Sequence, residues 1–127
     1  MINDRASIDP KYKWDLTAIY KNAAEFENDY MITEKMIKGF ASNEETMLRD
    51  ARSFCKTLSD MTKIDLMIGR LWQYASLNFS VDTSNSKNQA LNTRVRNLAV
   101  KAGEATWFVS PYMLKLDIEK INEWMKE

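Results

Sequence analysis

A single row of apolar or small residues runs through the middle of the sequence. Its members follow one another at steps of three and four, with only Asp65 interrupting: Met47, Ala51, Phe54, Leu58, Met61, Ile68, Trp72, Ala75 and Phe79. Such spacing is typical of one face of an α-helix. Because the register continues through a polar segment, we predict one helix over about residues 43–81, with at most a bend between Ser59 and Lys63.

A shorter row precedes it and predicts a second long helix. Asn22 and Glu25 have the spacing of a reciprocal capping pair, in which each side chain accepts a hydrogen bond from an otherwise unpaired backbone N–H. The helix should end near residues 39–41, and Ser42 with Glu45 repeats the capping spacing before the central helix. A link this short favours antiparallel neighbours. The expected core face is Ala23, Phe26, Tyr30, Thr33, Ile37 and Phe40.

A third row follows the turn-forming residues 81–85. Ser86 with Gln89 predicts another capping pair, and the helix is expected to stop before Pro111. The row consists of Leu91, Val95, Leu98, Ala102, Ala105 and Val109. A run of small residues predicts a close approach to the central helix near residues 61–68: Ala102, Gly103, Ala105 and Thr106.

Two short helical segments are expected at the ends of the array. Asp15 can cap a turn that begins at Leu16, and Asp117 can cap a last helix over residues 118–126. The last helix carries three apolar residues on one face: Ile118, Ile121 and Met125.

These patterns predict an all-α fold, an antiparallel bundle or array of three long helices with short terminal helices. No segment alternates with the period of a strand, and glycine and proline together number five, too few to punctuate a sandwich or barrel. We divide the chain into an extended N-terminal lead-in, residues 1–13, and one helical domain, residues 14–127. One domain is also what 127 residues favour.

Composition narrows the choice of partner and compartment. The 18 basic and 18 acidic residues cancel, so the chain lacks the broad positive charge that favours nucleic acid or an anionic membrane surface. Without an apolar run of membrane-spanning length, a cytoplasmic location is the expectation. The lone Cys55 cannot form an internal disulfide and is expected to pack as a small buried side chain.

The chemical repertoire is narrow because the chain contains no histidine. Nucleophile–histidine pairs and His-Glu-x-x-His zinc helices are therefore excluded, and the three glycines lie too far apart to form a phosphate loop. Carboxylate pairs such as Glu44-Glu45 fall at helix starts, where they complement the helix dipole. We predict no catalytic, cofactor-binding or metal-binding residue. The eight methionines could line an adaptable peptide groove, but filling the core is the favoured interpretation.

An ordered set of residues resembles the N-terminal region of oligoendopeptidase F, one of the thimet-oligopeptidase-like zinc metallopeptidases. The opening Lys13-Trp14-Asp15-Leu16 with Tyr20 is similar to the start of that family. The larger part of the set lies downstream: Tyr74-Ala75-Ser76-Leu77, Asp82-Thr83, Asn85, Gln89, Leu91, Leu98 and Pro111. The resemblance covers nearly the whole chain. It implies an almost wholly helical enzyme with two lobes around a channel that admits short peptides.

The resemblance also implies that the catalytic residues lie elsewhere. In the family, zinc is held by the two histidines of His-Glu-x-x-His and a later glutamate, all well beyond this length of chain. We therefore interpret the chain as a non-catalytic N-terminal fragment that forms part of the wall of the channel, with zinc and the oligopeptide substrate belonging to the intact parent. The alternative is a free-standing helical module that binds a partner helix.

Two partners follow from the fragment interpretation. The first is the remainder of the parent peptidase, and the second is another copy of the chain in a homodimer formed by apolar surface left uncovered. The residues expected on that surface are Met67, Leu71, Met113, Ile118, Ile121, Trp124 and Met125.

Overall fold

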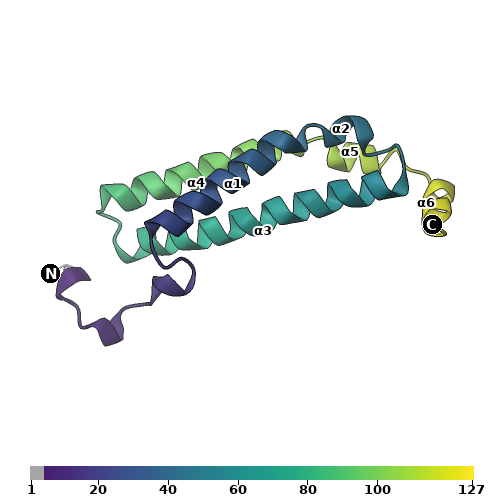
Figure 1. The fold of residues 1–127 in the computed structure, drawn as a ribbon. Helices are drawn as coiled ribbons and strands as arrows, with labels where there is room; N and C mark the ends of the chain where they lie inside the picture. The colour runs from purple at the N-terminus through teal and green to yellow at the C-terminus, as the bar shows by residue number, and fades with distance from the viewer. Residues whose placement is uncertain (1–4) are drawn as a thin grey trace.

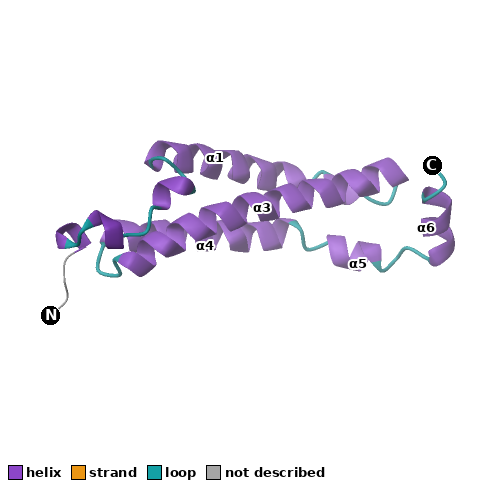
Figure 2. Ribbon diagram, turned by 90° about the horizontal axis from the view of Figure 1, so that it is seen from below, coloured by secondary structure: helices purple, strands orange, loops and turns teal. Residues whose placement is uncertain are grey.

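The computed structural model describes residues 5–127, and within that range it contains helices and turns but no strand (Figures 1 and 2). The predicted all-α class is therefore confirmed. The helices are α1 (Ala23–Phe40), α2 (Asn43–Thr46), α3 (Ala51–Val81), α4 (Ser86–Ala105), α5 (Val109–Met113) and α6 (Ile118–Trp124). Three single 3₁₀ turns precede them: η1 (Arg5–Ser7), η2 (Pro10–Tyr12) and η3 (Leu16–Ala18).

The three long helices α1, α3 and α4 lie side by side and alternate in direction (Figure 1). The longest, α3, contacts both of the others, while α5 and α6 lie beyond the end of α4, near the start of α3 (Figure 2). The predicted lead-in holds the turns η1 and η2, and its residues 1–4 lie outside the described residues. None of the helices in residues 5–127 combines the length and apolar character needed to cross a membrane.

The core runs the length of the bundle between these three helices. Helix α1 buries Phe26, Thr33, Ile37 and Phe40, and α4 buries Val95, Leu98 and Ala102, as their rows predict. Tyr20, Met47, Phe108 and Val109 extend the core at its two ends. Ala23 lies at the exposed first turn of α1 and is the one member of the predicted α1 row outside the core.

The predicted central helix over residues 43–81 is wrong at its beginning. Ser42 has helical backbone angles and makes no capping bond; its hydroxyl donates to the Gly39 carbonyl instead. The chain then turns once in α2, breaks, and restarts at Ala51, because the Asp50 carboxylate accepts a hydrogen bond from the Ser53 N–H at 2.7 Å. From there α3 continues unbroken through Ser59 to Lys63, as predicted.

The centre of the buried face of α3 is rotated by roughly 70° from the centre of the predicted row, since each residue advances about 100° around the helix. The buried residues are Thr57, Ile64, Leu71 and Ala75. Phe54, Leu58, Met61 and Ile68 form one edge of the core, and Trp72 is 38% exposed. Thr57 is polar and so does not count in a hydrophobic pattern, but its hydroxyl is satisfied by donating to the Ser53 carbonyl.

The other predicted N-terminal caps can be compared with the observed ones. Asn22, Asp15 and Asp117 each accept a backbone N–H as predicted, and Glu25 completes the first cap by accepting the N–H of Lys21 at 2.8 Å. The pair at Ser86 is wrong by one residue. Helix α4 is capped there by the residue before it, Asn85, whose side chain accepts the N–H groups of Lys87 and Asn88.

The end of α4 also differs in detail. The helix stops at Ala105, before Pro111, which lies in the first turn of α5, where it interrupts no helical hydrogen bond. Of the four small residues expected to approach the central helix, only Ala102 is buried. A Cβ atom on Gly103 would meet nothing within 4 Å, so Gly103 plays no part in a close helix contact.

Candidate functional site

A polar cluster fixes the residues before α1 onto the bundle. The Tyr20 hydroxyl donates to Asp29 of α1 at 2.8 Å, and Arg70 of α3 donates to the carbonyl of Ile19 at 2.8 Å. The Arg70 guanidinium also lies 4.5 Å from the centre of the Tyr20 ring. Burial and the hydrogen bond to the Asp29 carboxylate raise the pKa of Tyr20 above its usual value, so the phenol stays protonated. The cluster therefore holds Ile19 and Tyr20 against α1 and α3.

A bidentate ion pair joins α1 to α4. The Arg94 guanidinium donates with both of its terminal nitrogens to the Glu27 carboxylate, one bond measuring 2.9 Å, and lies 4.4 Å from the centre of the Tyr30 ring. These hydrogen bonds and the adjacent positive charge hold the pKa of Glu27 below its usual value. Both partners are committed to each other, so the pair offers no general acid or base.

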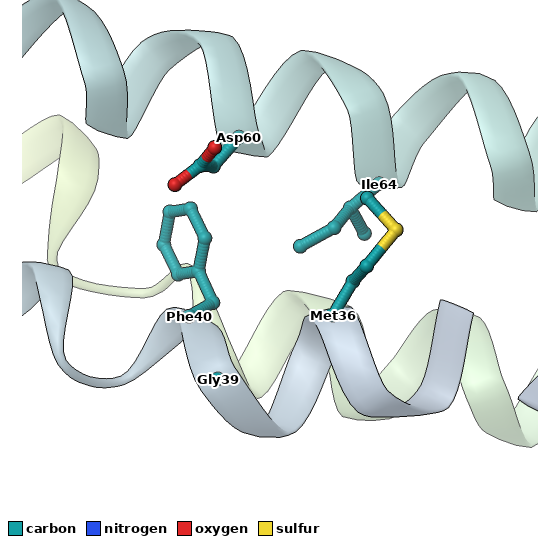
Figure 3. A pocket seen from close by; sticks show the side chains of 5 residues that line it. All are labelled: Met36, Gly39, Phe40, Asp60 and Ile64. Carbon is teal, nitrogen blue, oxygen red and sulfur yellow. The ribbon is translucent and has the colours of Figure 1, made fainter. Parts of the chain in front are cut away.

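A small pocket lies between the end of α1 and the middle of α3 (Figure 3). Met36, Gly39 and Phe40 line one side and Asp60 and Ile64 the other, around a volume of about 250 Å³. Figure 3 shows the Asp60 carboxylate directed from α3 toward the Phe40 ring, with Met36 and Ile64 facing each other beside it. A Cβ atom added to Gly39 would meet nothing within 4 Å.

The carboxylate in this pocket is already engaged. Asp60 accepts hydrogen bonds from Asn43 of α2 at 3.2 Å and from Lys56, and Lys63 lies 3.9 Å away. Burial alone would raise the pKa of Asp60, but these hydrogen bonds and positive charges outweigh it and hold the pKa below the usual value. The arrangement joins α2 to α3 and leaves no unpaired charge for a ligand.

An apolar groove lies at the start of α3, where α6 lies next to it (Figure 2). Helix α6 contacts α3 through Trp124, whose ring centre is 5.5 Å from that of Phe54. The groove has a volume of about 270 Å³ and is lined by Ala51, Phe54, Cys55, Ile121, Trp124 and Met125. No helix other than α3 and α6 contributes to this lining.

The exposure of individual side chains corrects the predictions for Cys55 and Leu71 and agrees with most of the predicted uncovered surface. Cys55 is exposed, not buried as expected, because it faces this opening. Leu71, expected on the uncovered surface, is fully buried, and Met67 and Trp124 are partly buried. The rest of that predicted surface is exposed: Met113 at 42%, Ile118 at 74%, Ile121 at 41% and Met125 at 79%. The methionines are divided, with Met47 in the core and Met31 in solvent.

The zinc ion that the resemblance implies does not fit the residues of this chain. The chain has no histidine to supply an imidazole ligand. In residues 5–127, the structure gathers no group of three or more cysteines, aspartates and glutamates that could hold a metal ion. The α3–α6 groove is lined almost wholly by apolar and aromatic side chains.

The sequence is similar along its whole length to known peptidases. It is 30% identical over 128 residues to the plasmid-encoded oligoendopeptidase F of Lactococcus lactis subsp. cremoris, covering 100% of this chain and 21% of that protein. It is 29% identical to an oligoendopeptidase F homolog of Borreliella burgdorferi, covering 100% and 21% of the two chains. Oligopeptidase PepF of Bacillus subtilis is 24% identical, covering 98% and 18%.

The chain thus spans about a fifth of the length of the curated relatives it matches, and the match lies in their first fifth. No family model matches the chain, and no solved structure matches it. The resemblance to the N-terminal region of oligoendopeptidase F, read from the ordered residue set, is confirmed.

Proposed function

We propose that this chain, which is similar over its whole length to the first fifth of oligoendopeptidase F, is a non-catalytic part of a zinc metalloendopeptidase that hydrolyses short peptides. The observation that carries the proposal is the match of 30% identity over the entire chain. In this role the chain contributes part of the N-terminal lobe and forms one wall of the channel that admits the peptide. Zinc and the groups that activate water come from the remainder of the peptidase.

The physical character of the chain supports a scaffolding role. Helix α3 packs along both α1 and α4, and the Arg94–Glu27 pair fixes the two outer helices to each other. The carboxylates of Asp29, Asp60 and Glu27 all have hydrogen-bond partners within the chain. A rigid helical wall requires such internal pairing, whereas a catalytic centre requires groups free to exchange protons.

The proposal can be tested by joining this chain to the last four fifths of the Lactococcus lactis relative, in place of that protein's own first fifth. The joined protein should cleave a quenched fluorescent oligopeptide, and a metal chelator should abolish the cleavage. The control is the relative without its first fifth, which should be inactive. If the truncated relative cleaves the peptide as fast as the joined protein, the chain is dispensable and the proposal fails.

A second candidate function is a free-standing helical module, favoured by the exposed apolar groove between α3 and α6. Its partner would be a helix of another protein or a second copy of this chain, paired about a two-fold axis. A coding sequence that continues past Glu127 to a His-Glu-x-x-His motif would decide for the peptidase. A stop codon at that point would decide for the module.

A further inference from the structure

The surface around α6 exposes more large apolar side chains than the fold of this chain accounts for. Leu114 is 87% exposed, Ile118 74% and Met125 79%, and none of the residues of α6 is buried. Apolar patches larger than a few hundred Å² are unusual on soluble monomers and commonly mark interaction surfaces. This end of the bundle therefore has the character of an uncovered interface.

The pattern of α6 shows which side lacks a partner. With about 100° per residue, Ile118, Ile121, Trp124 and Met125 fall within one arc of roughly 120°, and the charged residues of the helix fall outside it. Only one edge of that arc, at Trp124, packs against Phe54 of α3. The other edge, at Ile118 and Met125, is largely exposed, and Met125 lines the open side of the groove.

The groove suits a protein side chain better than a free small molecule. Small-molecule pockets usually exceed about 300 Å³ and contain several converging polar groups. This groove measures about 270 Å³, and five of its six lining residues are purely apolar or aromatic, Cys55 being the sixth. An amphipathic helix that inserts an aliphatic or aromatic side chain matches this shape and chemistry.

The relatives indicate where such a helix comes from. Four fifths of their length follows the region that this chain matches, and α6 lies at the end of the matched region. We infer that the groove between α3 and α6 binds a helix from the part of the peptidase that follows the matched region. The contacts are Ile121 of α6, Met125 directly after it, and Phe54 of α3. The inference rests on the proposed function and specifies the surface through which this chain is held.

Cys55, the only cysteine of the chain, provides a reporter inside the groove. The rate at which maleimide labels Cys55 is measured by peptide mass spectrometry, both in the free chain and in the protein joined to the rest of the Lactococcus lactis relative. We expect labelling at least about tenfold slower in the joined protein, because thiol reactions depend on access. A cysteine introduced by Ser80→Cys, at the exposed far end of α3, serves as reference and should label equally fast in both.

A matched pair of substitutions tests the contact itself. Ile121 and Ile32 are 41% and 42% exposed, but only Ile121 lines the groove. Ile121→Glu in the joined protein should return the labelling of Cys55 to the rate found in the free chain with the same substitution. Ile32→Glu, on the surface of α1, should leave Cys55 protected.

Each outcome decides the inference. Equal labelling of Cys55 in the free and joined proteins overturns it, as does protection that survives Ile121→Glu. Protection that appears in the free chain as its concentration rises overturns it in favour of a second copy as the occupant. If the joined protein cleaves the peptide while Cys55 stays unprotected, the proposed function stands and this surface is rejected. If Cys55 is protected but the peptide is not cleaved, the surface stands and the proposed function is rejected.

Discussion

Each end of the helical bundle carries a short segment: η3 and the residues up to Tyr20 at the first end, and α6 at the second end. The two segments begin with the same kind of cap but pack against the bundle differently. Each segment starts with an aspartate cap, Asp15 before η3 and Asp117 before α6, and each places an aromatic residue against α3. At the first end, Tyr20 is 2% exposed and its ring meets Phe26 and Tyr74 with centres 5.8 and 5.2 Å apart. At the second end, α6 buries none of its residues.

The difference lies in how many independent contacts hold each segment. The first end combines ring packing, the hydrogen bond from Tyr20 to Asp29 and the bond from Arg70 to the backbone of Ile19. The second end depends on the contact between Trp124 and Phe54. One end is thus completed within the chain, and the other presents the groove to which we assign a helix of the following region.

The largest effect expected from this comparison is at Tyr20. Tyr20→Ala removes a fully buried ring and leaves Asp29 without its hydroxyl partner, so the free energy of unfolding should fall by about 3–5 kcal/mol. Urea melts followed by far-UV circular dichroism measure it. Tyr20→Phe keeps the ring and should lose only about 1 kcal/mol. A loss below 1 kcal/mol for Tyr20→Ala would mean that the first end is no better closed than the second.

Local signals predicted the ends of several helices because the chemistry of a cap lies within a few residues. Asn22 and Asp117 could be identified in this way, since each side chain accepts a backbone N–H three residues later. The break in the helix before α3 could not be predicted from local signals. There Ser42 and Asp50 both had the chemistry of a cap, and only Asp50 makes a capping bond; Met47, which lies between them, is fully buried in the core.

Only one of the two walls of the groove could be predicted from the sequence. The spacing of Ile118, Ile121 and Met125 identified the exposed face of α6, because that information is contained in one helix. Its other wall is formed by Phe54 and Cys55, more than sixty residues earlier, and no periodicity reports such a pairing. The rotated buried face of α3 has the same explanation. Which of its residues are buried depends on how α1 and α4 pack against it, and the spacing of apolar residues within α3 does not contain that information.

At the second end, Trp124→Ala should have a smaller effect than the change at Tyr20. The substitution removes one aromatic pair at the surface, for which about 0.5–1.5 kcal/mol is expected. The same urea melts apply, and the loss of near-UV circular dichroism from Trp124 reports its packing. A destabilisation as large as that of Tyr20→Ala would show that α6 is integral to the fold and would remove the contrast between the two ends.

The first end should also respond to alkaline pH. Because burial and the bond to Asp29 raise the pKa of Tyr20, the unfolded chain releases this proton near pH 10 while the folded chain retains it. The contribution to stability is therefore complete below pH 10 and is lost as pH rises above it. Between pH 9 and 11, the wild type should lose about 1 kcal/mol more than Tyr20→Phe.

The matched control for this pH dependence is Tyr12→Phe, since Tyr12 is 73% exposed. Its stability should follow that of the wild type from pH 9 to 11. Parallel curves for the wild type and Tyr20→Phe would contradict the buried hydrogen bond at the first end.

The smallest effect is expected at Ile118, the first residue of α6, whose side chain is 74% exposed. Ile118→Glu removes little buried apolar area, and a negative charge at the start of a helix interacts favourably with the helix dipole, so stability should stay within about 0.5 kcal/mol of the wild type. The same substitution at Ile37, which is 6% exposed, would bury an unpaired charge and should abolish cooperative unfolding. A loss of more than 1 kcal/mol for Ile118→Glu would mean that this edge of α6 already has a partner within the chain or in a second copy, and the second end would then be closed like the first.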